Sequence, residues 1–117
     1  LTRSFAELCR LGRVLGAKSE TLTGLSGLGD LVLTATSRSS RNYSFGVRVG
    51  EGRSITAPVA GAHPLVEGIE TAAALVARAK RHAVELPIAE TVADILSGAL
   101  DLEAALPRLM ARPFKTE

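Results

Sequence analysis

EGIETAAALVARAKRHAVE, residues 67–85, is the stretch that decides the fold class. Its apolar side chains recur every three or four positions, which is the spacing of one face of an α-helix. Alanine, the residue with the highest helix propensity, dominates the stretch. We therefore predict one long helix here, with an inner stripe made of Ile69, Ala72, Ala73, Val76, Ala79 and Ala83.

Two more helices are predicted after this stretch. Pro87 suits the first position of a helix, and Gly98 suits the position just after its end. Asp101 is predicted to cap a last helix, and residues 110–117 are expected to form a loose tail. The inner residues expected for the two helices are Ile88, Val92, Ile95, Leu96, Ala99, Leu102, Leu106 and Leu109.

A helix over residues 1–15 is predicted at the other end of the chain, with Gly16 as its stop. Its expected inner stripe is Leu1, Phe5, Leu8, Gly12 and Leu15, and its expected outer residues are Arg3, Glu7 and Arg10. Ser19 is expected to cap the next helix.

The middle of the chain is less regular. Residues 31–33 could form a short strand by composition, but no partner strand is evident, so we favour a short buried helix. A further helix is predicted from Arg41 to about Gly50, and residues 51–64 are interpreted mostly as loop.

The fold class is therefore all-α, a single domain over residues 1–117. The sequence contains no strand-helix-strand unit from which a dinucleotide-binding fold could be built.

Composition narrows the function classes. Hydrophobic residues make up 46% and the mean hydropathy is +0.22, so some apolar surface is expected to face another domain or subunit. The net charge is +2 with basic residues spread out, which argues against a nucleic-acid partner. One cysteine, Cys9, excludes an intrachain disulfide and favours a reduced, cytoplasmic protein. No metal site and no membrane span are expected.

Asp30 is the first candidate for chemistry. It stands between a glycine-rich turn and an apolar run, where a carboxylate is expected to be partly buried and to need a cation or several donors. The alternative is that Asp30 merely caps the following helix. The residues themselves leave both interpretations open.

Residues 39–42, Ser-Ser-Arg-Asn, are the second candidate. A serine cap, backbone N–H groups, a guanidinium and a carboxamide converge where a helix opens, which suits a phosphate group. The alternative is an ordinary capped helix with a surface arginine, and this tetrapeptide alone favours that alternative.

Together the two motifs are more specific. GLSGLGDLVLTATS (residues 24–37), SRN (40–42) and FG (45–46) closely resemble the signature of bacterial NAD(P)-dependent glycerol-3-phosphate dehydrogenases. VEG (66–68) and LPI (86–88) follow in the family's order, so the resemblance covers essentially the whole chain.

The resemblance implies an all-α C-terminal substrate domain of the 6-phosphogluconate-dehydrogenase-like type, a fragment without its N-terminal Rossmann domain. The family interconverts dihydroxyacetone phosphate and sn-glycerol 3-phosphate with NADH or NADPH, which supplies phospholipid synthesis. The fragment alone is expected to be inactive, because the family's catalytic lysine is expected upstream of Leu1.

The resemblance also implies roles for individual residues. Asp30 would support the catalytic lysine and neighbour the substrate. The implied substrate-binding residues are Asp30, Thr34, Ser40, Arg41 and Asn42, and the implied cofactor-binding residues are Arg41, Leu65 and Glu67.

Two other functions stay open. A related oxidoreductase acting on a different hydroxy acid is opposed by the phosphate-type motif at residues 40–42. A non-catalytic helical module for oligomerisation or anion binding is the alternative from another class. Under either function, assembly with further copies of the same chain is left open.

Overall fold

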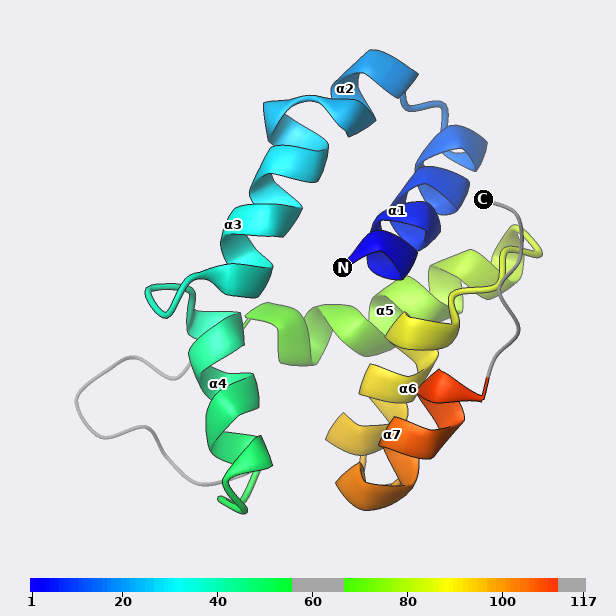
Figure 1. Ribbon diagram of the computed structural model, residues 1–117. Helices are drawn as coiled ribbons and strands as arrows, with labels where there is room; N and C mark the ends of the chain where they lie inside the picture. The colour runs from blue at the N-terminus through cyan, green and yellow to red at the C-terminus, as the bar shows by residue number, and fades with distance from the viewer. Residues whose placement is uncertain (56–66, 112–117) are drawn as a thin grey trace.

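The computed structural model describes residues 1–55 and 67–111. The elements in these ranges are all helices (Figure 1), so the all-α prediction is confirmed. They are α1 (Thr2–Val14), α2 (Ser19–Thr23), the π-helix η1 (Leu25–Gly29), α3 (Asp30–Thr36), α4 (Arg41–Gly50), α5 (Glu67–Arg81), α6 (Pro87–Leu96) and α7 (Leu102–Met110).

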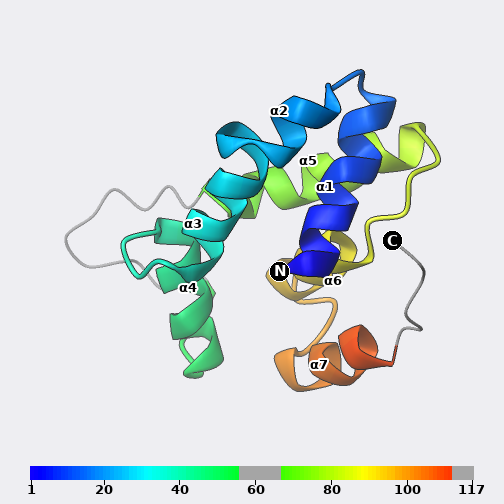
Figure 2. The same cartoon turned by 45° about the horizontal axis from the view of Figure 1, so that its top comes forward.

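The core lies where α1, α5 and the start of α6 meet. Leu11, Ala79 and Leu86 are buried there, and partly buried side chains of Leu75, Val84 and Ala89 surround them. Figures 1 and 2 show that α5 begins beside α4 and runs across to the group formed by α1 and α6. At the start of α5 the Gly68 N–H donates to Asn42 of α4, so α5 connects the core to the α3–α4 arm, which carries the candidate site.

Glu7 is the clearest departure from the sequence prediction. We expected it on the outer face of the first helix, but it is only 6% exposed. Its Oε1 accepts the Ile88 N–H at 2.7 Å and its Oε2 accepts the Ala89 N–H at 3.2 Å. A carboxylate at a helix start satisfies backbone N–H groups that lack partners within the helix. Glu7 therefore caps α6 from α1.

Replacing Glu7 by alanine is expected to lower the free energy of unfolding by about 3 kcal/mol, because a buried carboxylate and its two charge-assisted hydrogen bonds to part-buried backbone donors are lost. Glu7→Gln retains one acceptor oxygen and should lose less. Chemical denaturation of the three proteins measures the difference. As a control, Glu20→Ala changes an exposed carboxylate in the first turn of α2 and should have a much smaller effect. Equal losses for Glu7→Ala and Glu20→Ala would contradict this role.

The predicted helix stops are largely confirmed. Gly16 and Gly98 follow the ends of α1 and α6 with φ of 85° and 77°, in the left-handed region that favours glycine. Pro87 is the first residue of α6. However, α5 ends at Arg81 rather than Glu85, and the chain turns at Ala83, whose φ is 53°.

Two predicted helix caps differ from the structure. Ser19 lies inside α2, whose N-cap residue is Lys18, so the prediction of a Ser19 cap was wrong. Asp101 occupies the N-cap position of α7, but its side chain makes no capping hydrogen bond. In both cases the helix begins near the predicted residue, and the side chain does not supply the predicted contact.

Several residues predicted to be inside are exposed. In α7 the buried residue is Ala105, whereas Leu106 is 62% exposed, because α6 is the main neighbour of α7 and covers one narrow face. The other exposed members of the predicted stripes are Leu1, Leu8, Leu15, Ala73, Ala83, Val92, Ala99 and Leu102. Met110 belongs to α7, while residues 112–117 of the expected tail lie outside the described residues.

The exposed leucines and valines agree with the surplus of apolar surface expected from composition. Among residues 1–55 and 67–111, no helix is both long enough and apolar enough to span a bilayer.

Candidate functional site

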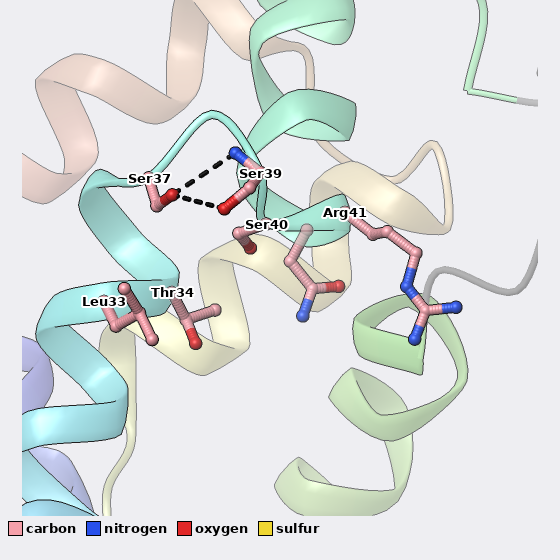
Figure 3. Close-up of a pocket in the computed structure, with 7 residues that line it drawn as sticks. Leu33, Thr34, Ser37, Ser39, Ser40 and Arg41 are labelled. Atoms are coloured by element: carbon pink, nitrogen blue, oxygen red, sulfur yellow. Dashed lines mark hydrogen bonds between the residues drawn. The ribbon is translucent and has the colours of Figure 1, made fainter.

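A pocket of about 310 Å³ lies where the end of α3 meets the start of α4 (Figure 3). This volume is at the lower end of the range typical of small-molecule sites. The lining residues are Leu33, Thr34, Ser37, Ser39, Ser40, Arg41 and Asn42. The structure therefore brings together Thr34, Ser40, Arg41 and Asn42, which the sequence had nominated from two separate motifs.

Ser40 opens α4 as its N-cap residue. Its backbone is extended, with φ of −68° and ψ of 126°, and its Oγ accepts the Tyr43 N–H at 3.3 Å. The predicted serine cap is therefore confirmed. The first turn of a helix presents backbone N–H groups and the positive end of the helix dipole, which together attract anions.

The turn before α4 is held by serine hydroxyls. The Oγ atoms of Ser37 and Ser39 lie 2.6 Å apart, and the Ser39 N–H donates to Ser37 Oγ at 3.3 Å (Figure 3). On the other side, Ser44 Oγ donates to the Arg38 carbonyl at 2.6 Å. We had not singled out Ser37 as a lining residue, although closely spaced serines before a helix favour such turns.

Arg41 lies at the edge of the pocket. Its side chain is exposed and extends away from the hydroxyls of Ser37 and Ser39, on the opposite side from Thr34 (Figure 3). A guanidinium in this position can offer parallel hydrogen bonds to an anion that also reaches the start of α4.

Asn42 links the pocket to α5. Its Oδ1 accepts the N–H of Gly68, the second residue of α5, at 3.2 Å. The starts of α4 and α5 are therefore joined by one side chain.

Asp30 is exposed, so the prediction of a partly buried carboxylate was wrong. The reason is that its helix α3 packs mainly against η1 and α4, which leaves its outer face open. Asp30 makes no capping hydrogen bond either, because Gly29 before it is already helical. Asp30 does not line the pocket, but it stands one helical turn before Thr34, so the two residues share a face of α3.

The predicted glycine turn before Asp30 is instead the π-helix η1, which runs into α3. Gly27 is buried in it against the end of α2, and a Cβ built on Gly27 would stand 2.1 Å from the carbonyl oxygen of Leu22. Only glycine permits this approach. Short π-helical segments are frequent at functional sites.

The apolar residues after Asp30 form a helix, as we favoured, but the helix is not buried. Leu33 is 63% exposed and Val32 is 39% exposed. Both lie on the same open arm of the structure as Asp30, so the exposure has the same cause.

Two predicted site residues remain, Leu65 and Glu67. Leu65 lies outside the described residues. Glu67 is the first residue of α5.

The fold and the pocket together define an all-helical domain with an anion-suited pocket at a helix start. Residues 1–107 match the family model described as NAD-dependent glycerol-3-phosphate dehydrogenase C-terminus. The chain belongs to this family.

Individual relatives agree with the family match. The chain is 50% identical over 117 residues to glycerol-3-phosphate dehydrogenase [NAD(P)+] of Rhodospirillum rubrum, covering 100% of the chain and 34% of that relative. It is 53% identical over 116 residues to the protein of the same name from a Bradyrhizobium species, with 99% and 34% coverage. The chain thus spans about a third of the length of these relatives.

A solved structure supports the same assignment. The crystal structure of glycerol-3-phosphate dehydrogenase from Coxiella burnetii matches with a TM-score of 0.81 and 41% sequence identity. The match covers 95% of this chain and 34% of that one.

Proposed function

We propose that this chain is the substrate-binding domain of a cytoplasmic NAD(P)-dependent glycerol-3-phosphate dehydrogenase. The reaction is dihydroxyacetone phosphate plus NAD(P)H to sn-glycerol 3-phosphate plus NAD(P)+, or its reverse, and it supplies phospholipid synthesis. The observation that carries the proposal is the pocket at the start of α4, which Thr34, Ser40, Arg41 and Asn42 line together.

The phosphate group of the substrate is proposed to bind at the start of α4. Ser40, Arg41 and Asn42 there offer a hydroxyl, a guanidinium and an amide beside the positive end of a ten-residue helix. These groups complement a dianion by charge and by hydrogen bonding. Thr34, on the α3 side of the pocket, is proposed to meet the hydroxyl-bearing end of the substrate.

The reacting oxygen needs a proton donor or a positive charge when hydride reaches the carbonyl carbon. We propose that a lysine from the N-terminal part of the protein supplies it, and that Asp30 holds this lysine charged and oriented. The exposure of Asp30 supports the proposal, because an open carboxylate one turn from Thr34 is accessible to a side chain from outside this domain. An opposite charge nearby favours the protonated form of a lysine.

NAD or NADP, when bound, supplies or accepts the hydride. The regular elements within residues 1–55 and 67–111 are all helices, so we propose that an N-terminal Rossmann domain holds the cofactor. Arg41, Leu65 and Glu67 are proposed to contact it from this side. We propose that the same domain covers the exposed apolar side chains. A second copy of this chain is the alternative that could cover them.

The function is tested with two proteins. The full-length protein is expected to oxidise NADH or NADPH when dihydroxyacetone phosphate is added, measured by absorbance at the nicotinamide band. Purified residues 1–117 are expected to show no turnover, because they lack the proposed lysine and cofactor domain. A full-length protein without this activity would overturn the proposed reaction. Turnover by the purified domain would overturn the proposal that the lysine and the cofactor site lie in another part of the protein.

A further inference from the structure

Gly68 and Asn42 meet at unusually close range. The Gly68 N–H donates to Asn42 Oδ1 at 3.2 Å, and a Cβ built on Gly68 would stand 2.8 Å from the same oxygen and 3.3 Å from Asn42 Cγ. Real Cβ contacts are almost never that short. A glycine at position 68 therefore permits the amide to lie against the backbone at the start of α5.

This contact decides which way the amide of Asn42 faces. A carboxamide has one acceptor oxygen and one NH2 group that donates twice. A backbone N–H needs an acceptor, so Gly68 selects the oxygen, and the NH2 group is directed elsewhere. Asn42 also lines the pocket, so the orientation matters for what binds there.

An anion interacts very differently with the two ends of the amide group. The NH2 group would donate to a phosphate oxygen, whereas the carbonyl oxygen would repel it. With its oxygen held by the Gly68 N–H, Asn42 keeps its NH2 group available to donate to an incoming anion.

We infer that Gly68 is a positioning residue for the phosphate end of the substrate, acting through the amide of Asn42. The inference deepens the proposed function and rests on it. The contact also brings the positive end of the fifteen-residue helix α5 close to that of α4. Two helix starts then share one side chain, and that side chain lines the pocket.

The competing explanation is that Asn42 only caps α5. Asparagine is a favoured capping residue, and such a cap would stabilise the helix without any ligand. The two explanations predict the same loss of stability when the contact is broken. They differ in one respect. Only a positioning role predicts weaker binding of the phosphate group in a variant whose stability is unchanged.

Asn42→Asp in the full-length enzyme separates them. Aspartate retains an acceptor for the Gly68 N–H, so the melting temperature should stay near that of the wild type. Its second oxygen replaces the NH2 donors with negative charge. We expect KM for dihydroxyacetone phosphate to rise about 10-fold or more, from the value of a hydrogen bond to a charged group.

Gly68→Ala is the second variant, and Gly50→Ala is its matched control. A Cβ at Gly50, the last residue of α4, meets no atom within 4 Å. Gly68→Ala should displace the amide and raise KM for dihydroxyacetone phosphate about fivefold to tenfold, whereas Gly50→Ala should leave it unchanged. If Gly68→Ala does not fold, Asn42→Asp decides alone.

Each outcome has one meaning. Wild-type KM in a folded Asn42→Asp or Gly68→Ala enzyme would overturn the positioning role and leave the proposed function standing. A lowered melting temperature with an unchanged KM would also overturn it, in favour of a purely structural cap. A wild-type enzyme that does not act on dihydroxyacetone phosphate would instead overturn the proposed function, and this inference with it.

Discussion

Arg41→Ala in the full-length enzyme is expected to raise KM for dihydroxyacetone phosphate on the order of 100-fold. Each hydrogen bond from a guanidinium to an anion contributes about 1.5–3 kcal/mol, and Arg41 can make two in parallel. Arg41 lines the pocket and is exposed at the start of α4, where the phosphate is proposed to bind. Steady-state kinetics with varied substrate and saturating cofactor measure the effect.

Arg38→Ala is the matched control for Arg41→Ala. Arg38 is an exposed arginine three residues earlier that does not line the pocket. Its removal changes the net charge equally, so a general electrostatic effect would appear in both variants. Arg41→Lys should recover only part of the loss, because an ammonium lacks the parallel donors. Unaltered kinetics in Arg41→Ala would refute the assignment of this residue.

Gly27→Ala is expected to lower the free energy of unfolding by about 3 kcal/mol or more, or to prevent folding. The added Cβ would stand 2.1 Å from the Leu22 carbonyl oxygen, 2.6 Å from its carbonyl carbon and 2.7 Å from its Cα. These are backbone atoms, so no side-chain rotation relieves the overlap. The α2–η1 contact would have to open, and thermal or chemical denaturation would report the loss.

Gly29→Ala provides the comparison within the same π-helix. A Cβ there meets the end of the Leu25 side chain at 3.4 Å, an ordinary contact with a flexible and exposed group. The change in stability should stay within about 1 kcal/mol. If the two alanine variants were equally stable, the close approach at Gly27 would not constrain the fold.

Local signals predicted the helices well. The positions of Pro87, Gly16 and Gly98 depend only on backbone preferences of single residues, and the structure confirms all three. The Ser40 cap depends on a partner three residues away and is also confirmed. Such features can be inferred from sequence because cause and effect lie within one turn of helix.

Long-range partners could not be predicted in the same way. Periodicity placed Glu7 on an outer face because a carboxylate usually prefers water. Its partners are backbone N–H groups, which almost every residue has, so the sequence does not indicate which of them it contacts. The contact of Asn42 with Gly68 could not be predicted for the same reason.

The structure places four of the predicted site residues, Thr34, Ser40, Arg41 and Asn42, around one pocket. Their roles in binding stay a prediction. Asp30 was expected to be buried, but in this chain its helix has an open outer face. We propose that Asp30 meets a lysine from outside this domain, and a contact of that kind leaves no local pattern in the sequence.

The contact of Glu7 with the start of α6 has a consequence for the order of events during translation. Glu7 and Ile88 are separated by 81 positions, so the ribosome must synthesise most of the domain before their hydrogen bond can form. Until then the Glu7 carboxylate lacks the backbone N–H groups of α6, and contacts between distant residues are slow to form. The Glu7 contact can therefore form only after the elements that line the pocket have been synthesised.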